Sequence, residues 1–429
     1  MNSKTFFKIL IFFSIIALSY IFYKSEIIHE GLRVSYYLTY YFLIIAFLTF
    51  FVLVYNLKKK IRDYSLIVFF SIVISIYLYE GFAVYKMEKN VDLTSQKSKV
   101  NIYKKLKKKN PNIRVVMDPA QHLRNPNLNF IPLSGISNIE TINCKESSFF
   151  SVFKSDRFGF NNPDRIWNND FIENIVVGDS FSLGSCVNRP NDITSVLNEL
   201  STESSLTIGY NSNGPLLALA SLKEYLFKDT TNVLWLYFEG NDLEDLEAEL
   251  GNPILIKYLN DKNFTQNLKT QQKKIDKFLN NIFINEFQEN LNKITNIANR
   301  NKSRKNRFKR FVNFIKLYET RQLLFHSFPL NHLKKVLLRA KNLSNEKGAK
   351  FYFVYLPSYE RYKYGKDINK YESVLRMVNQ LDIEIIDIHK EIFSKIENPL
   401  SLFPYSKNGH YNENGYRQTA LVIHNLINN

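Results

Sequence analysis

A serine and an asparagine that follow apolar runs of the chain, with a histidine that precedes its last helical pattern, could together carry out acyl transfer. The tripeptide GDS at 178–180 and the tripeptide GND at 240–242 each follow such a run, and His410 precedes the last helical pattern. Each feature alone is usually a turn or a surface residue. Their joint order predicts a site that cleaves or transfers an ester, because a serine hydroxyl needs a neighbouring histidine to become a nucleophile.

Each of these residues can be given a role in that reaction. Ser180 stands where a strand turns into a helix, which exposes its hydroxyl and places its backbone N–H at a helix N-terminus that favours negative charge. The side-chain amide of Asn241 and the backbone N–H groups of Ser212 and Gly214 could converge on the same oxygen and form an oxyanion hole. His410 would take the serine proton and return it to the leaving group.

The elements that must position these residues alternate along the chain from about residue 170. Short β-branched or aromatic runs predict strands at 175–179, 205–209, 232–238, 350–356 and 383–388. Apolar residues at three-to-four spacing predict helices at 192–200, 215–227, 332–345, 371–380 and 413–426. This alternation predicts an α/β fold, in which a parallel sheet is covered on both faces and ligands bind beyond the carboxyl ends of its strands.

The chain before and within this pattern divides into further regions. We expect a transmembrane region at 1–90, a polar, lysine-rich juxtamembrane linker and lead-in at 91–150, and the α/β domain at 151–429. A polar, helix-compatible stretch at 252–325 interrupts the alternation and predicts a helical insertion. Its basic run KSRKNRFKR at 302–310 is typical of a solvated face. The alternative is a contact with anionic lipid head groups or an acidic glycan.

Three apolar stretches near the N-terminus are long enough to cross a hydrocarbon core, which needs about 20 residues. They run between Lys4 and Lys24, from Val34 to Leu57, and from Tyr64 to Tyr85, where Glu80 is the one charged residue. A cleaved signal peptide is the rival interpretation of the first stretch, but no small-x-small cleavage site follows it. We therefore expect a multi-pass protein of the inner membrane, with the lipid bilayer as its partner.

The short loops predict the orientation of these spans. Three lysines and an arginine lie between 58 and 62, whereas the loop from 24 to 33 is nearly charge-balanced. The positive-inside rule places the basic loop in the cytoplasm and the C-terminal domain outside it. The formal charge of +17, from 57 Lys+Arg and 40 Asp+Glu, could suggest nucleic-acid binding, but an extracytoplasmic domain disfavours that role. Compositional drift is the simpler account of the charge.

The chain has two cysteines, Cys144 and Cys186. Two thiols cannot build a disulfide-rich scaffold or a four-thiolate zinc site, and we expect no metal and no cofactor. In an oxidising compartment a Cys144–Cys186 disulfide is expected rather than two free thiols. It would tie the lead-in segment across the helix of Ser180 and stiffen the start of that helix.

Taken together, these motifs resemble the SGNH (GDSL-type) hydrolase superfamily over roughly residues 150–429. The first block corresponds to GDS at 178–180 with Gly184, the third block to GND at 240–242, and the last histidine to His410. The segments GDSFSLGSCV and FPYSKNGHYNENGY look like membrane-anchored bacterial members and the O-acyltransferase-like branch that modifies surface glycans. The resemblance implies a serine esterase or acyltransferase with a flavodoxin-like three-layer fold that needs no metal.

Two positions depart from the superfamily pattern. The superfamily usually has an aspartate three residues before its histidine, and this chain has Lys407 there. A backbone carbonyl, Asp387 or Glu413 could orient the imidazole instead. The glycine of the second block falls nearest Ser212, where a backbone N–H is still available because any residue but proline supplies one.

The sequence therefore predicts hydrolysis or transfer of an acyl group, such as acetyl, on a cell-envelope glycan through Ser180 and His410. The alternative, which Lys407 motivates, is a catalytically inactive glycan-binding or assembly protein with the same fold. A third interpretation, hydrolysis of an envelope lipid or a thioester, differs from the first only in its substrate.

Overall fold

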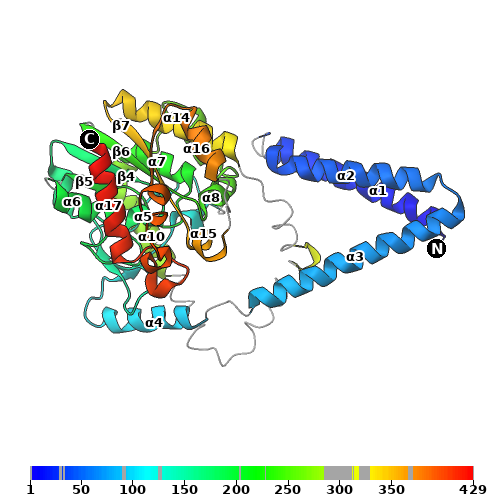
Figure 1. Cartoon of the computed structure of the whole chain (residues 1–429), viewed down its shortest axis with the longest axis horizontal. Coiled ribbons are helices and arrows are strands. Elements are labelled where there is room, and N and C mark those ends of the chain that lie inside the picture. The colour runs from blue at the N-terminus through cyan, green and yellow to red at the C-terminus, as the bar shows by residue number, and fades with distance from the viewer. Residues whose placement is uncertain are drawn as a thin grey trace. The chain divides into compact units, whose positions relative to one another are not determined.

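The computed structural model of the chain describes residues 2–28, 31, 34–88, 93–123, 128–201, 204–227, 229–284, 312, 314–317, 329–365 and 371–428 (Figure 1). The chain forms two compact units. The first contains residues 1–93 and 295–327, and the second contains residues 94–294 and 328–429.

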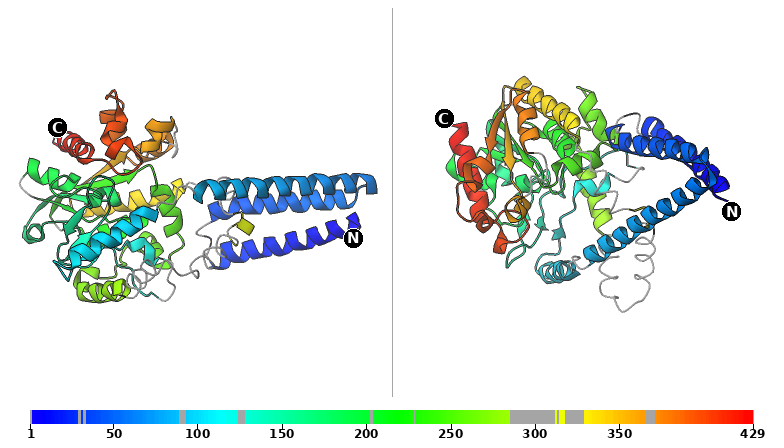
Figure 2. Two further views of the ribbon diagram at one scale, coloured as in Figure 1. Left: turned by 90° about the horizontal axis from the view of Figure 1, so that it is seen from below. Right: turned by 45° about the vertical axis from the view of Figure 1, so that its right-hand side comes forward.

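The first unit contains three long apolar helices, drawn in blue in Figure 2. They are α1 (Ser3–Phe22, continued by a π-helical turn at Tyr23–Ile28), α2 (Val34–Tyr55) and α3 (Lys59–Glu88). Each is long and apolar enough to cross a membrane. Many of their large side chains point outward, such as Phe42 and Leu78, which are 70% and 69% exposed. The three predicted membrane helices are present, and their apolar surfaces suit lipid rather than water.

A small apolar core holds the first unit together. Phe7 of α1 and Phe51 of α2 are buried, with their ring centroids 6.1 Å apart. Tyr77 of α3 contacts the ring of Phe314, and its hydroxyl donates a hydrogen bond to the carbonyl of Ile315 (3.1 Å). Part of the predicted insertion therefore packs against α3, in the first unit.

The second unit is built on a five-stranded parallel sheet with the strand order β5-β4-β6-β7-β8. In chain order the strands are β4 (Ile172–Val177), β5 (Ser205–Thr207), β6 (Thr230–Phe238), β7 (Lys350–Leu356) and β8 (Glu384–Asp387). Each corresponds to one of the five predicted apolar runs. The order is that of flavodoxin-like sheets, in which the chain changes direction between the first and third strands and leaves a crevice there. The predicted fold class is confirmed.

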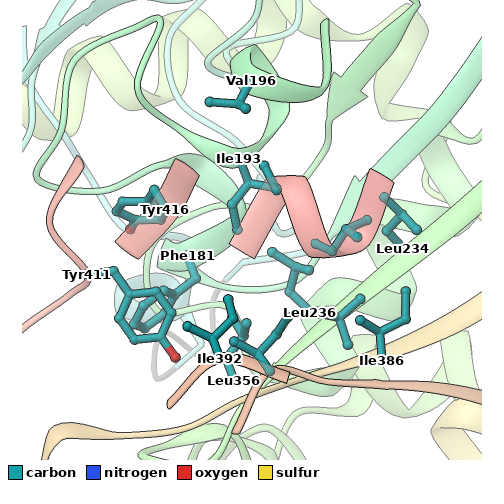
Figure 3. Packing of buried hydrophobic residues seen from close by; sticks show 14 of the residues in the cluster. Phe181, Ile193, Val196, Leu234, Leu236, Leu356, Ile386, Ile392, Tyr411 and Tyr416 are labelled. Atoms are coloured by element: carbon teal, nitrogen blue, oxygen red, sulfur yellow. The ribbon is translucent and has the colours of Figure 1, made fainter. Parts of the chain in front are cut away.

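Helices cover both faces of this sheet (Figure 1). On one face lie α6 (Ile193–Leu200) and α17 (Glu413–Ile427), and on the other lie α7 (Pro215–Tyr225), α14 (Leu330–Glu346) and α16 (Tyr371–Asn379). The two sets arise because parallel crossovers are right-handed, so a chain that first moves one way along the sheet and then the other places its helices on opposite faces. Figure 3 shows the core on the α6–α17 face, where Ile193, Leu236 and Tyr416 pack together.

Residues 91–150 are more regular than the predicted linker. They contain α4 (Leu93–Lys107) and the strands β1 (Arg114–Val115) and β2 (Glu140–Ile142) of a small sheet that β3 (Val152–Lys154) completes. Tyr103 of α4 packs in a separate core with Ile142 and Phe283. The segment thus belongs to the second unit, and the linker prediction is wrong for the greater part of its length.

The predicted insertion at 252–325 divides between the two units. Its described part in the second unit contains α9 (Pro253–Asn260) and α10 (Gln272–Ile282), which follow α8 (Asp242–Glu249). The basic run at 302–310 lies outside the described residues.

Candidate active site

A sharp turn after β4 positions Ser180. Gly178 has φ +151°, and a Cβ atom there would lie 2.7 Å from the carbonyl oxygen of Leu236, so both the angle and the space require glycine. Asp179 then caps the one-turn helix α5 (Ser180–Leu183), because its Oδ1 accepts a hydrogen bond from the N–H of Phe181 (2.9 Å). The turn exposes Ser180 at the carboxyl end of β4, on the crevice side of the sheet.

Apolar packing beneath the site holds Ser180 and His410 next to each other. Phe181, the residue after Ser180, and Tyr411, the residue after His410, are both buried with ring centroids 4.8 Å apart (Figure 3). The ring of Phe181 also contacts the imidazole of His410 at 5.0 Å. Two segments that are more than 200 residues apart in sequence are therefore joined by apolar packing directly below their polar residues.

The predicted nucleophile and base lie within hydrogen-bonding distance. The Nε2 atom of His410 is 2.8 Å from the Oγ atom of Ser180. The imidazole is half-buried, with 22% of its side-chain surface exposed. This distance is what a histidine needs to accept the proton of a serine hydroxyl.

A residue that the sequence analysis missed, Glu146, completes the arrangement. Its Oε1 lies 2.9 Å from Nδ1 of His410, and its Oε2 accepts the backbone N–H of the same histidine at 2.6 Å. A carboxylate can only accept hydrogen bonds, so Nδ1 carries the ring proton and Nε2 faces Ser180 as an acceptor. Glu146 thus holds both the tautomer and the main chain of His410.

Neither carboxylate proposed from the sequence has this role. Asp387, at the end of β8, accepts hydrogen bonds from the hydroxyl of Tyr371 and from the N–H of Lys390 (3.2 Å). Glu413 is exposed at the start of α17. The one signal that could have pointed to Glu146 is its place two residues after Cys144, since the expected disulfide brings that segment to the helix of Ser180.

The electrostatics of the pair favour an ionised carboxylate and a basic imidazole. Burial by itself lowers the pKa of His410, but the hydrogen bond to Glu146 and the charges of Glu146 and Asp179 outweigh it, and the pKa is raised above its usual value. Burial acts to raise the pKa of Glu146, yet its hydrogen bonds to His410 and the imidazole charge hold that pKa below its ordinary range. Glu146 is therefore a carboxylate at neutral pH.

The structure contains a disulfide between Cys144 and Cys186. It joins the segment of Glu146 to the chain that follows α5. Asn143 lies beside the bridge, where its Nδ2 donates a hydrogen bond to Ser185 Oγ (3.1 Å) and its Oδ1 accepts one from Asn211 (2.8 Å).

Two of the four predicted oxyanion donors line the pocket that contains the Ser–His pair. These are Ser180, whose backbone N–H begins α5, and Asn241, which follows β6. Asn241 Nδ2 donates one hydrogen bond to Asp245 Oδ2 (2.7 Å), and an amide nitrogen carries a second N–H that a ligand can use. Burial and the charge of Asp179 raise the pKa of Asp245 to about 7.

The other two predicted donors do not line this pocket. The N–H of Gly214 donates to Oε1 of the buried Glu249 at 2.8 Å, so it is already used, and the prediction for Gly214 is wrong. Ser212 has φ +59°, a left-handed conformation that favours glycine. A glycine would adopt this conformation with less strain than serine.

The pocket beside Ser180 has a volume of about 480 Å³. Aromatic rings, amides, two hydroxyls, an imidazole and a carboxylate surround it: Ser180, Phe181, Phe238, Gly240, Asn241, Ser358, Glu360, Asn408, Gly409 and His410. Asn408 donates a hydrogen bond to the carboxylate of Glu360 at its edge. The pocket therefore places apolar rings beside several hydrogen-bonding groups.

One group near the site has the residue types of a metal centre. Donor atoms of Glu146, Cys186 and His410 lie within 4.8 Å of one another. The sulfur of Cys186 is already in a disulfide, and both ring nitrogens of His410 face Glu146 and Ser180. These three residues therefore fit a hydrogen-bonded catalytic centre and not a metal-binding centre.

Comparisons with known proteins add little to this geometry. No family model and no curated protein matches the sequence. Among solved structures, the chain is similar to the psychrotrophic esterase EstA from Pseudoalteromonas sp., in a structure inhibited by monoethylphosphonate. The two are 12% identical, the match covers 60% of this chain and 99% of that chain, and the TM-score is 0.30. A similarity with so low a TM-score supports no functional argument.

Proposed function

We propose that the protein is a membrane-anchored serine esterase or O-acyltransferase of the SGNH type, which acts on acyl esters, such as acetyl esters, of a cell-envelope glycan. The observation that carries the proposal is the continuous hydrogen-bonded chain from Ser180 Oγ through the imidazole of His410 to Glu146. A nucleophile, a base and a carboxylate that orients the base are the three parts of a catalytic triad.

The reaction follows from these positions. His410 Nε2 takes the proton of Ser180 as Oγ attacks the carbonyl carbon of the ester, and the negative charge that develops on the carbonyl oxygen is stabilised by the N–H of Ser180 and the amide of Asn241. The C–O bond to the leaving alcohol then breaks, and that alcohol takes the proton from His410. Water, or a hydroxyl of an acceptor, then attacks the acyl carbon with His410 again as the base; the bond between that carbon and Ser180 Oγ breaks, and Oγ takes the proton back from His410.

The pocket and the anchor support the glycan as the substrate. Glu360 and Asn408 offer a carboxylate and an amide at the pocket edge, and Phe238 adds an aromatic ring. Such polar groups beside a ring match the hydroxyl groups and C–H faces of a sugar. Three helices suited to a membrane would hold this site close to the envelope.

Ester hydrolysis by the full chain in detergent tests the proposal. Wild-type protein is expected to cleave an activated acetyl ester and to be labelled at Ser180 by a fluorophosphonate. Ser180→Ala should lose at least about a thousandfold in kcat/KM, because the nucleophile is removed. Ser394→Ala, a change at an exposed serine outside the pocket, is the matched control and should behave as wild type. A wild-type protein that neither cleaves the ester nor becomes labelled contradicts the proposal.

The alternative of a catalytically inactive glycan-binding or assembly protein now has less support. It was motivated by Lys407 in the place of an aspartate, and Glu146 meets the same chemical need from another part of the chain. A lipid or thioester substrate remains the competing choice within the enzyme class. Comparing acetylated oligosaccharides with phospholipids and acyl thioesters, each with the Ser180→Ala variant as the background, separates these substrates.

A further inference from the structure

Glu146 stands apart from the fold that carries its two partners. Ser180 and His410 follow β4 and precede α17, whereas Glu146 lies in the loop between β2 and β3 of the small sheet. The N–H of Ser151 donates to the carbonyl of Cys144 (2.9 Å), which closes this loop at its base. The carboxylate therefore reaches the site from a loop and not from an element of the main sheet.

Few other contacts fix the side chain of Glu146. Within the described residues, both of its carboxylate oxygens bond to His410 and to no other residue. The neighbouring Lys145 is exposed, and the buried hydroxyl of Ser147 has no hydrogen-bond partner among the described residues. The nearest covalent anchor of the loop is the disulfide at Cys144, two residues away.

That anchor leads directly to the nucleophile. Cys186 lies six residues after Ser180, and its Sγ is 3.6 Å from Nδ1 of His410, the same nitrogen that Glu146 contacts. Hydrogen bonds thus link Glu146 to His410 and His410 to Ser180. The chain from Ser180 to Cys186 and the disulfide to Cys144 then connect Ser180 back to the loop of Glu146. Each catalytic group is thus held to the next by a hydrogen bond or by a short covalent path.

We infer that the Cys144–Cys186 disulfide is the positioning element of the catalytic carboxylate, so that full activity requires the bridged form of the protein. The inference rests on the proposed function and deepens it. Without the bridge, hydrogen bonds such as those of Asn143 to Ser185 and Asn211 would have to hold the loop of Glu146 in place, and a displacement of about 1 Å in a catalytic group can cost about a hundredfold in rate. Reduction to two thiols takes two electrons and two protons, which a phosphine reductant and water supply as the phosphine becomes its oxide.

A double-mutant cycle on the full chain in detergent tests this inference. The four proteins are wild type, Glu146→Gln, Cys144→Ser with Cys186→Ser, and the combination of all three changes. Loss of the bridge should lower kcat about 10- to 100-fold with little change in KM. In the Glu146→Gln background its loss should cost less than about threefold, because the carboxylate that it positions is already absent. Lys145→Ala is the matched control in the same loop and should retain wild-type kcat.

Two further measurements keep the outcome clear. Reducing folded wild-type protein with the phosphine should reproduce the loss, and reoxidation should restore activity, which excludes misfolding of the serine variants. The pKa of His410, followed by NMR of labelled histidine, needs no turnover. Glu146 and Asp179 are the charged groups that act on this ring, and the pKa should fall when the bridge is opened.

Either of two results overturns the inference: full kcat without the bridge, or multiplicative losses in the cycle together with an unchanged pKa of His410. The proposed function fails separately, if wild-type protein shows no reaction that depends on Ser180. In that case the NMR measurement still decides whether the bridge positions Glu146.

Discussion

At the scale of single residues, Glu146 supplies the carboxylate that this chain lacks three positions before His410, and it does so through two hydrogen bonds. It accepts both the ring N–H and the main-chain N–H of His410, so one side chain fixes the tautomer and the place of the backbone. Gly409 makes room for this contact, because a Cβ atom there would lie 2.7 Å from the carboxyl carbon of Glu146. The negative charge opposes the effect of burial and keeps the imidazole basic.

Replacing Glu146 by glutamine should separate these effects in a pH–rate profile. His410 must be neutral to accept the serine proton, so wild-type activity is lost as the pH falls through its raised pKa. Glu146→Gln removes the charge, and the ascending limb should move to lower pH. The value of kcat should drop by about a hundredfold to ten-thousandfold, as when a triad carboxylate is replaced by its amide. Glu413→Gln, at an exposed position, is the control, and an unmoved limb would count against the assigned role of Glu146.

At the scale of elements, a buried ion pair joins the strand ends that form the far side of the pocket. Glu239 follows β6, immediately before Gly240 and Asn241, and only 1% of its side-chain surface is exposed. It accepts hydrogen bonds from Arg361 of α15 (Tyr359–Tyr364), from the hydroxyl of Tyr355 and from the N–H of Ser358 (2.7 Å). This cluster ties the start of α15 to the loop that carries Asn241, and so fixes that loop.

Breaking that ion pair from one side should be costly. Arg361→Met would leave the carboxylate of Glu239 buried without its cation and should lower the free energy of unfolding by about 3–5 kcal/mol. Adding Glu239→Gln should recover part of the loss, because the unpaired charge is then removed. Urea unfolding of the full chain measures both. Lys395→Met, which breaks the exposed pair with Glu391, serves as the comparison and should cost less than about 1 kcal/mol. If Arg361→Met and Lys395→Met lower the free energy of unfolding equally, the assignment of a stabilising buried ion pair at Glu239 is refuted.

At the scale of the whole molecule, three apolar helices precede a unit that carries polar chemistry. The basic residues between 58 and 62 lie at the junction of α2 and α3, and the second unit contains a disulfide. Both features favour a cytoplasmic location for that junction and an extracytoplasmic location for the second unit. We propose this topology for the inner membrane.

Thiol labelling in intact cells tests the topology. The native cysteines are paired, so single cysteines can be introduced at Lys60, which is exposed in the first turn of α3, and at Lys395, which is exposed on the second unit. A membrane-impermeant maleimide should reach Lys395→Cys once the outer envelope is opened. It should reach Lys60→Cys only after the inner membrane is lysed. The reverse pattern would place the active site in the cytoplasm.

The sheet and the Ser–His pair could be predicted because local patterns determine them. Each strand is a short apolar run, and the residues after parallel strands meet at one edge, so Ser180 and Asn241 could be assigned to a common pocket. Glu146 could not be predicted, because it lies 264 residues from His410 in a loop without periodicity. The wrong prediction for Gly214 has a similar cause, since the carboxylate that takes its N–H is Glu249, 35 residues away.

The structure of residues 91–150 could not be predicted from the sequence for a different reason. Strands β1 and β2 have two and three residues, too few to show the alternation that identifies a strand. Lysines also dominate α4, and its buried residues become visible only once the partner surface is known. A polar composition therefore predicted a linker where tertiary contacts produce a helix and a small sheet.

The order of the candidate catalytic residues along the chain decides when the proposed site can form during synthesis. Glu146, Ser180 and both cysteines are synthesised first, and His410 follows 224 residues after Cys186. The Cys144–Cys186 bridge can therefore close before the imidazole of His410 has been made, and until then the nascent chain lacks the base that the proposed ester chemistry needs. Under the proposed topology, the second unit thus begins its export before the Ser180–His410 pair can form.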